Sequence, residues 1–461
     1  MSFHSSRSLP RFLTRFAAVA VVAIAAAAPL RAETLTDALI SAYKNSNLLE
    51  QNRALLRAAD EDVATAVASL RPVLSYAASA NRSYGSQSSS FSATLTLSAD
   101  IMLFNFGRSQ MAVDLARESV LATREALVSV EQNVLYSAVD AYMSVISAAE
   151  FVALRESNVR LITQELRAAQ DRFELGEVTR TDVSLAEARL ALARANLAAA
   201  QGDYNAARER YKAAIGHYPG QLSPPPAAPR TAKTVEAARS IAMRMHPSIL
   251  QAQREVTINE LSIEIAKAAM KPALTAGAST SLIDGGTTSS SLNLTLSGPI
   301  YQGGKLSAAY RKAIAQRDAA RSGLLQQSVL VEQNVGIAWS QVAVAAAQLE
   351  ASDRQIRAST VAYRGVREEA TLGARTTLDV LNAEQELLDA KASRISAYST
   401  YYTATYALLR EMGLLTVDHL KLGIVTYDPE GYYNAVKTAP VRKVSPQGQK
   451  LDRVLKSIGK N

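Results

Sequence analysis

The most constraining feature of this sequence of 461 residues is that its second half repeats landmarks of its first half. Several landmarks recur in the same order at a spacing of 197 residues, and they are Gly176 with Gly373, Asp182 with Asp379, Gly216 with Gly413, and segment 104–108 with segment 301–305. A repeat of this kind predicts one supersecondary unit used twice, whose copies bury their apolar faces against each other.

The repeat divides the chain into segments. We expect a signal peptide over residues 1–32, a first structural repeat over 33–222, a linker over 223–230, a second repeat over 231–416, and a polar C-terminal segment and tail over 417–461. The linker reads Ser-Pro-Pro-Pro-Ala-Ala-Pro, a composition that favours a stiff, extended polyproline conformation.

The first 32 residues have the composition of a secretory leader. Arg7, Arg11 and Arg15 precede the apolar run Phe16–Ala28, and Leu30–Ala32 is a plausible cleavage site. The alternative is a membrane-spanning helix, which needs about 20 apolar residues and is therefore longer than this run. We expect no later stretch to be long and apolar enough to cross a membrane as a helix.

Charge and cysteine content exclude several classes of protein. Removal of the leader takes away four arginines and no acidic residue, so the net charge falls from +8 to +4. Nucleic-acid binding usually needs a clustered basic stripe, and we expect none. With no cysteine in the chain, neither disulfides nor an N-terminal lipid on cysteine can contribute.

Each half predicts one very long helix and two shorter ones. No glycine or proline occurs from Arg108 to Leu175, which predicts a single rod about 100 Å long. The other predicted helices cover Leu35–Leu70, Thr181–Ile215, Val235–Met270, Ser307–Leu372 and Thr377–Met412. Leu135, Ala138, Tyr142 and Val145 recur in steps of three and four, as in coiled-coil packing, although periodicity alone does not exclude an ordinary coiled coil.

Each half also predicts a β-hairpin. From Phe91 to Leu103 apolar residues alternate with serine, threonine and aspartate, and Leu74–Asn81, Leu274–Ser279 and Leu292–Ser297 show the same pattern. Polar segments at 85–90 and 284–290 join the paired strands. Strands with one apolar and one hydroxyl-rich face are typical of membrane β-barrels, and a hairpin packed on a soluble core is the alternative.

Four strands in one chain cannot close a barrel, because single-chain membrane barrels start at about eight strands. Open edges cannot face lipid, since their backbone N–H and C=O groups would remain unpaired. Strands that span a membrane therefore require an oligomer, and a conducting pore favours three or more chains over two, because an eight-stranded barrel is filled by its own side chains.

With these features, the sequence resembles the TolC family of outer-membrane efflux proteins. The resemblance covers Leu35 to about Leu415 and rests on the doubled layout, on Phe173–Val183, on Leu372–Leu381, and on Tyr301–Gly304 after a strand. It implies a mostly α-helical chain with transmembrane β-strands. The fold would be a homotrimeric twelve-stranded β-barrel, four strands per chain, continued by a twelve-helix periplasmic α-barrel with coiled-coil packing.

The resemblance also implies a function and partners. The chain would be a duct in the outer membrane of a Gram-negative bacterium, with a large periplasmic portion. It would export drugs, other toxic small molecules or secreted proteins, within a tripartite efflux pump or a type I secretion system. Its partners would be a periplasmic adaptor, an inner-membrane pump or ABC transporter, and outer-membrane lipid.

The resemblance assigns roles at the two helical tips. Asp379 and Asn382 would face the pore at a periplasmic gate, and Arg375, Thr181 and Asp182 would latch neighbouring helices. Adaptor docking would involve the tip residues Leu175, Gly176, Glu177, Leu372, Gly373 and Ala374. The chain departs from the family pattern at Asn382, where a second acidic residue is usual, and at Ala370, where a tyrosine joins the latch. The residues alone favour a simpler role for Thr181 and Asp182, as caps of the following helix.

Catalysis, metal binding and cofactor binding are not expected. His217, His246 and His419 are isolated, so no pair has metal-ligand spacing. Gly303-Gly304-Lys305 lacks the full spacing of a phosphate-binding loop. The rival to an export duct is a soluble periplasmic coiled-coil adaptor or scaffold. In the C-terminal segment we expect Tyr427, Tyr432 and Tyr433 to anchor part of the chain against the helices and the rest to be a mobile tail.

Overall fold

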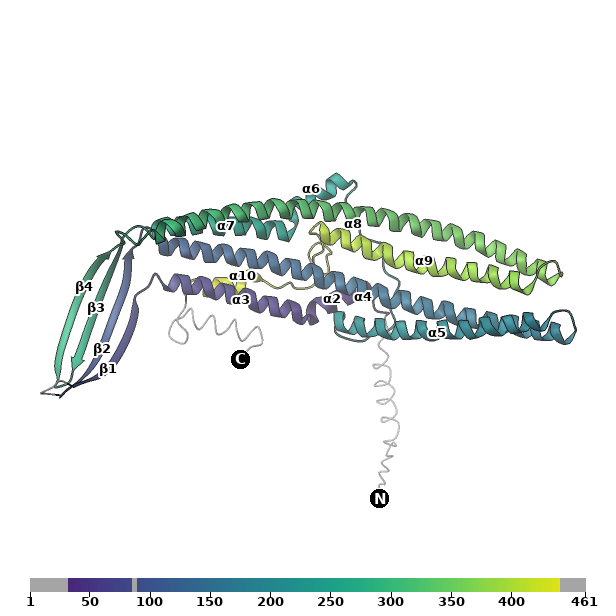
Figure 1. Ribbon diagram of the computed structural model, residues 1–461, viewed down its shortest axis with the longest axis horizontal. Coiled ribbons are helices and arrows are strands. Elements are labelled where there is room, and N and C mark those ends of the chain that lie inside the picture. The colour runs from purple at the N-terminus through teal and green to yellow at the C-terminus, as the bar shows by residue number, and fades with distance from the viewer. Residues whose placement is uncertain (1–31, 85–88, 440–461) are drawn as a thin grey trace, which may run out of the picture.

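The computed structural model describes residues 32–84 and 89–439 of the chain. The predicted signal peptide, apart from Ala32, and the predicted mobile tail from residue 440 onward lie outside the described residues. Within them the chain forms one elongated molecule, with a β-sheet at one end and two helical turns at the other (Figure 1).

The same order of elements occurs twice. The first set is α2 (Leu35–Asn45), α3 (Asn47–Ala68), β1 (Val73–Tyr84), β2 (Ser89–Phe104), α4 (Arg108–Glu174) and α5 (Arg180–Ile215). The second is α6 (Val235–Met245), α7 (Pro247–Ala268), β3 (Ala273–Ile283), β4 (Thr287–Ser297), α8 (Lys305–Thr371) and α9 (Thr377–Glu411). A short helix, α10 (Pro429–Val436), follows.

The long helices set the length of the molecule. α4 and α8 have 67 residues each, which corresponds to about 100 Å. α3 and α5 both pack against α4, the first beside the half next to the sheet and the second beside the far half, and α7 and α9 do the same along α8 (Figure 1). Shorter helices placed end to end therefore accompany each long one, as the helix lengths predicted, although α2 and α6 add a third short helix to each half.

Two of the sequence-based helix predictions were wrong in one respect. The stretch predicted as one helix from Leu35 to Leu70 is interrupted at Ser46, and the stretch from Val235 to Met270 is interrupted at His246. Ser46 has an extended backbone, and its hydroxyl accepts a hydrogen bond from the N–H of Leu49, so it caps the helix that follows. The second interruption can be explained from the sequence. His246 precedes Pro247, and the proline ring disfavours the helical conformation of the residue before it.

The four strands form one antiparallel sheet in the order β1-β2-β3-β4. Its register places Tyr76 opposite Leu97, Leu95 opposite Leu282, and Ala276 opposite Leu294, so apolar residues share one face across all four strands. Most large side chains of that face are exposed, and Leu292 is the most exposed of them at 86%. The opposite face carries serine and threonine, some linked across strands as Ser75 is to Ser98 at 2.7 Å.

The main hydrophobic cluster lies where the two halves of the molecule meet. Leu135, Ala138, Tyr142 and Val145 of the predicted seam are all buried in it. The hydroxyl of Tyr142 also donates to the backbone carbonyls of Glu33, at 3.0 Å, and Ser223, at 2.7 Å. The start of the first repeat and the start of the linker are thereby fixed to the long helix.

The C-terminal segment is anchored by tyrosines, as expected. The hydroxyl of Tyr432 donates to Glu61 Oε1 at 2.6 Å, and the backbone N–H of Tyr427 donates to the hydroxyl of Tyr43 at 3.2 Å. The guanidinium of Arg124 lies 5.4 Å from the ring centroid of Tyr433. The segment therefore runs along α3 and α4 towards the sheet.

One expectation about membrane-spanning helices was wrong. Among the described residues, α4 contains a stretch that is long and apolar enough to cross a membrane by composition alone. A third of that stretch is buried within the chain. Because α4 packs against α2, α5 and α9, we attribute its apolar composition to contacts between helices.

Candidate gate at the helical tips

The two tips farthest from the sheet have the same backbone geometry. After α4, Gly176 has φ +74°, and the N–H of Glu177 donates to the carbonyl of Arg172 at 2.9 Å. After α8, Gly373 has φ +76°, and the N–H of Ala374 donates to the carbonyl of Glu369 at 2.9 Å. This is a Schellman turn, which satisfies the last helical carbonyls and needs a residue in the left-handed region.

Each returning helix begins with a reciprocal cap. Asp182 Oδ2 accepts from the Thr179 hydroxyl at 2.7 Å and from its backbone N–H at 3.0 Å, and the Asp182 N–H donates back to the hydroxyl. Asp379 and Thr376 make the same contacts in the second tip, at 2.9 and 3.0 Å. These hydrogen bonds stabilise the ionised carboxylates and lower the pKa of both aspartates.

The predicted latch residues do not all come together within one chain. Arg375 Nε lies 2.8 Å from Glu369 Oε2, across its own turn. Thr181 is exposed and makes no side-chain hydrogen bond within the part of the chain that the structure describes. Leu175 and Leu372 are 76% and 84% exposed, so both tips present an apolar side chain at their ends.

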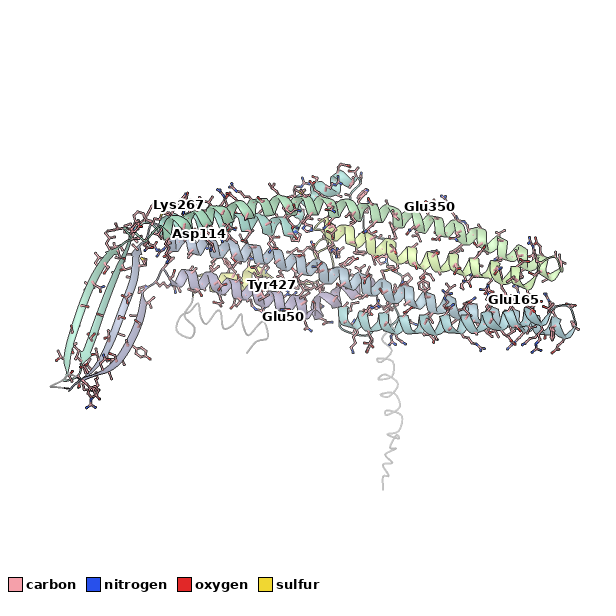
Figure 2. The ribbon with its side chains drawn as sticks, viewed as in Figure 1. Glu50, Asp114, Glu165, Lys267, Glu350 and Tyr427 are labelled. Atoms are coloured by element: carbon pink, nitrogen blue, oxygen red, sulfur yellow. The ribbon has the colours of Figure 1, made fainter. Side chains whose placement is uncertain are left out.

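Asn382 connects the two tip hairpins. Its Oδ1 accepts from Arg189 Nη2 of α5 at 3.3 Å. Nearby, Arg367 of α8 approaches Glu165 of α4, with Nε 3.8 Å from Oε1. Figure 2 places Glu165 among the helices close to the tips. The sequence reasoning missed Arg189 and Arg367, because charged residues on exposed helix faces are too common to single out.

A buried polar pair joins the same two hairpins. Asn158 Nδ2 of α4 donates to Glu384 Oε1 of α9 at 2.7 Å, and Glu384 is only 4% exposed. Burial raises the pKa of Glu384 to about 7, against the lowering effect of the Asn158 hydrogen bond. Sequence could have indicated this residue, since Glu384 falls between Leu381 and Leu388 on the buried stripe of its helix.

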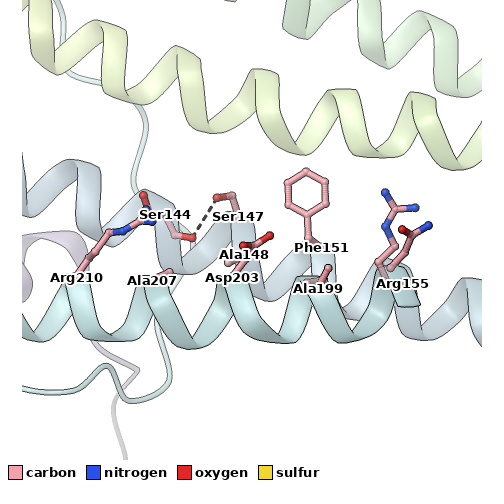
Figure 3. A pocket seen from close by; sticks show the side chains of 11 residues that line it. Ser144, Ser147, Ala148, Phe151, Arg155, Ala199, Asp203, Ala207 and Arg210 are labelled. Carbon is pink, nitrogen blue, oxygen red and sulfur yellow. Dashed lines mark hydrogen bonds between the residues drawn. The ribbon is translucent and has the colours of Figure 1, made fainter. Parts of the chain in front are cut away.

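A separate groove lies between α4 and α5, well away from the tips. It has a volume of about 430 Å³ and is lined by small residues such as Ala200 and Ala207, with Arg155, Asp203 and Arg210 at its sides (Figure 3). The alanines let the two helices approach closely. None of the residues predicted for the gate or the tips lies in it.

The geometry is that of a membrane channel protein. One end is an open sheet with an apolar outer face, and the other is a pair of helical tips with acidic residues at fixed positions. In the described residues no three histidine, aspartate or glutamate side chains converge as metal ligands.

The chain belongs to the outer membrane efflux protein family, whose sequence profile matches residues 39–217 and 238–414. It is 36% identical to the outer membrane efflux protein BepC of Brucella suis, over 90% of this chain and 93% of BepC. It is 25% identical to the alkaline protease secretion protein AprF of Pseudomonas aeruginosa, over 66% of each chain. The outer membrane protein VceC of Vibrio cholerae has the same fold, with a TM-score of 0.72 and 20% identity over 82% of this chain and 96% of VceC.

Family membership confirms several predictions. The fold is that of the trimeric barrel-and-tunnel channels, with four strands contributed by each chain. The protein is an outer-membrane export channel with a periplasmic tunnel, and the family consists of channels, not enzymes. The alternative of a soluble adaptor or scaffold is therefore wrong. The roles assigned to individual tip residues remain predictions.

Proposed function

We propose that this chain is the exit duct of a tripartite export machine, with its strands in the outer membrane and its helical tips reaching an inner-membrane complex. AprF is named for the secretion of a protease and BepC for efflux. The same duct geometry suits both cargo classes, so we propose that it passes small toxic compounds, secreted proteins, or both.

The observation that carries this proposal is the exposed apolar face of the sheet. Within the described residues, β1 and β4 each leave one edge without a partner strand. A membrane sheet cannot leave such edges in lipid, because unpaired backbone groups cost several kcal/mol each. Three chains joined edge to edge remove the problem and leave the serine and threonine face towards the lumen.

We further propose that the tips form the periplasmic gate. Asp379 begins α9 in its cap, and in a trimer three copies would place three carboxylates around the axis. Asn382 adds no second charge, so the ring holds three charges instead of six and should attract cations only moderately. Arg375, Thr181 and Asp182 would latch neighbouring tip helices of the trimer in the closed arrangement. Within one chain, the hydrogen bond from Arg189 to Asn382 would join the two hairpins.

The tips also suit docking of a periplasmic adaptor. Leu175, Gly176 and Glu177 on one tip and Leu372, Gly373 and Ala374 on the other are exposed and share one backbone conformation. Channels of this family work with adaptors and inner-membrane pumps. We propose that an adaptor meets both tips by the same contact, with the exposed leucines as apolar anchors.

The test of docking is export in cells that lack the native gene. Wild type should restore export of a fluorescent dye, whereas Leu175→Asp with Leu372→Asp should not, because charge at both anchors removes the apolar contact. The matched control is Leu192→Asp, a change of the same kind at an exposed leucine of α5 away from the tips. The amount of each variant in the outer-membrane fraction must equal that of wild type, so that a loss of export reflects lost docking and not lost protein.

Two outcomes would contradict parts of the proposal. Full export by the double variant would contradict docking at the tips but leave the duct intact. Absence of wild-type protein from the outer-membrane fraction would contradict the duct itself.

A further inference from the structure

The place where the sheet meets the helices carries an uneven distribution of charge. Each of the four helix–strand connections has a basic residue in it or at its end, namely Arg71, Arg108, Lys271 and Lys305, and none of the four contains aspartate or glutamate. This level corresponds to the periplasmic rim of the barrel, where the headgroups of the inner leaflet lie. Basic residues at such a level attract anionic headgroups.

Phe106 is the unusual residue at this rim. Its φ is +56°, a left-handed conformation that bulky side chains rarely adopt. The repeat places Gly303, with φ +57°, at the equivalent position of the second half. The same turn is therefore made without strain in one half and with a strained phenylalanine in the other, and such strain persists only where surrounding contacts hold the residue in place.

The ring of Phe106 continues the apolar face of the sheet. It lies 4.8 Å from the ring of Phe104, measured between centroids. Phe104 pairs with Leu274 beyond a bulge in β2 and so lies on the same face as the exposed leucines. Phe104 and Phe106 are 54% and 40% exposed. Both rings are thus accessible from the lipid side, as in the aromatic belts of membrane proteins.

A lysine completes the cluster. Lys271 Nζ lies 4.8 Å from the ring centroid of Phe106, and its side chain is exposed. It forms no ion pair within residues 32–84 and 89–439, whereas Lys267, one turn earlier on α7, is paired with Glu264 at 2.6 Å. Figure 2 shows Lys267 at the end of the helices next to the sheet. Arg71 is also engaged, because it donates to the backbone carbonyls of Thr438 and Ala439.

We propose that Lys271, Phe104 and Phe106 form a binding site for an anionic phospholipid of the inner leaflet. The lysine ammonium would pair with the headgroup phosphate, and the two rings would lie at the boundary between headgroup and acyl chains. The second half has glycine in place of Phe106, so the site occurs once per chain and three times per trimer. The proposal rests on insertion of the strands in the outer membrane.

Native mass spectrometry tests the site. The trimer is reconstituted in vesicles of phosphatidylglycerol and phosphatidylcholine and released into detergent, and the lipids it retains are weighed. Wild type should retain up to three phosphatidylglycerol molecules in preference to phosphatidylcholine. Lys271→Gln should lower this retention about fivefold, which corresponds to about 1 kcal/mol for one basic residue at the surface. Phe106→Gly should lower it as well and should still fold, because the second half makes this turn with glycine.

The controls separate the site from general charge. Lys271→Arg and Lys267→Gln should both retain phosphatidylglycerol as wild type does. Unchanged retention in Lys271→Gln, equal retention of the two lipids, or displacement by inorganic phosphate would overturn the proposal. Single-channel conductance of Lys271→Gln should equal that of wild type, so a failed lipid prediction leaves the export duct standing.

Discussion

At the scale of single residues, the cap aspartates were predictable, whereas the contact between the buried Asn158 and Glu384 was not. Asp182 and Asp379 stand out because the repeat places them at the same position. The structure gives Asp182 the capping role that its sequence suggested, and it gives Asp379 the same role. The capping role suggested for Thr181 was wrong, because Thr179 caps that helix. Asn158 and Glu384 are 226 residues apart, and their contact depends on how α9 lies against α4. No local pattern in the sequence carries that information.

Glu384 predicts a pH dependence of the gate. Its pKa rises from 4.5 to about 7 when the hairpins pack together. At a pH below 4.5, Glu384 is protonated whether the hairpins are packed or separated, and at a pH above 7 it is ionised in both states. Between these values the packed state binds more protons, so the contact between the hairpins loses stability as the pH rises. The open probability of single channels should therefore be higher at pH 8 than at pH 5.

Glu384→Gln should remove this difference, since glutamine keeps an acceptor for Asn158 but does not titrate. The control Glu386→Gln, on an exposed part of the same helix, should keep it. An unchanged pH response in Glu384→Gln would mean that the contact between the hairpins does not govern opening.

Thr376 predicts a local change in stability. Replacing this cap residue by alanine should cost about 1 kcal/mol, so amide hydrogen exchange in the first turn of α9 should speed up about fivefold. Thr181→Ala removes a hydroxyl that makes no described hydrogen bond and should leave exchange at the start of α5 unchanged. Equal effects of the two substitutions would contradict the capping geometry.

At the scale of elements, the sequence predicted the long helices and the hairpins well because their evidence is local. The absence of glycine and proline gave α4, and strict alternation gave the face of β2. The interruption at Ser46 could not be predicted, because a serine within an apolar helical pattern does not by itself end a helix. α10 was also missed, since eight residues after Asp428 are too few to show a period.

Adjacent residues of β4 test which face of the sheet meets lipid. Leu292 lies near the middle of the strand on the apolar face, and Asn293 lies on the polar face. Leu292→Lys should cost about 2–4 kcal/mol at the bilayer midplane and deplete the protein from the outer-membrane fraction. Asn293→Lys should insert normally. The reverse ranking would place the serine and threonine face in lipid.

At the scale of the whole molecule, a single chain cannot form a closed barrel or tunnel. Its sheet has two free edges, its apolar face needs lipid, and its helices form one wall of a tunnel about 100 Å long. The sequence predicted that several chains must combine, but the residues alone only favoured three or more chains over two. The number three came from the family, because strand count per chain does not fix how many chains close a barrel.

We predict that this export channel is gated, and single-channel recording in a planar lipid bilayer tests both the pore and its gate. We predict discrete, long-lived conductance steps for the purified oligomer. Cations added on the side of the tips should block the wild type moderately, and Asp379→Ala should weaken that block. A folded oligomer that inserts in the bilayer and never conducts, even with Arg375→Ala to release the tip, would contradict the account.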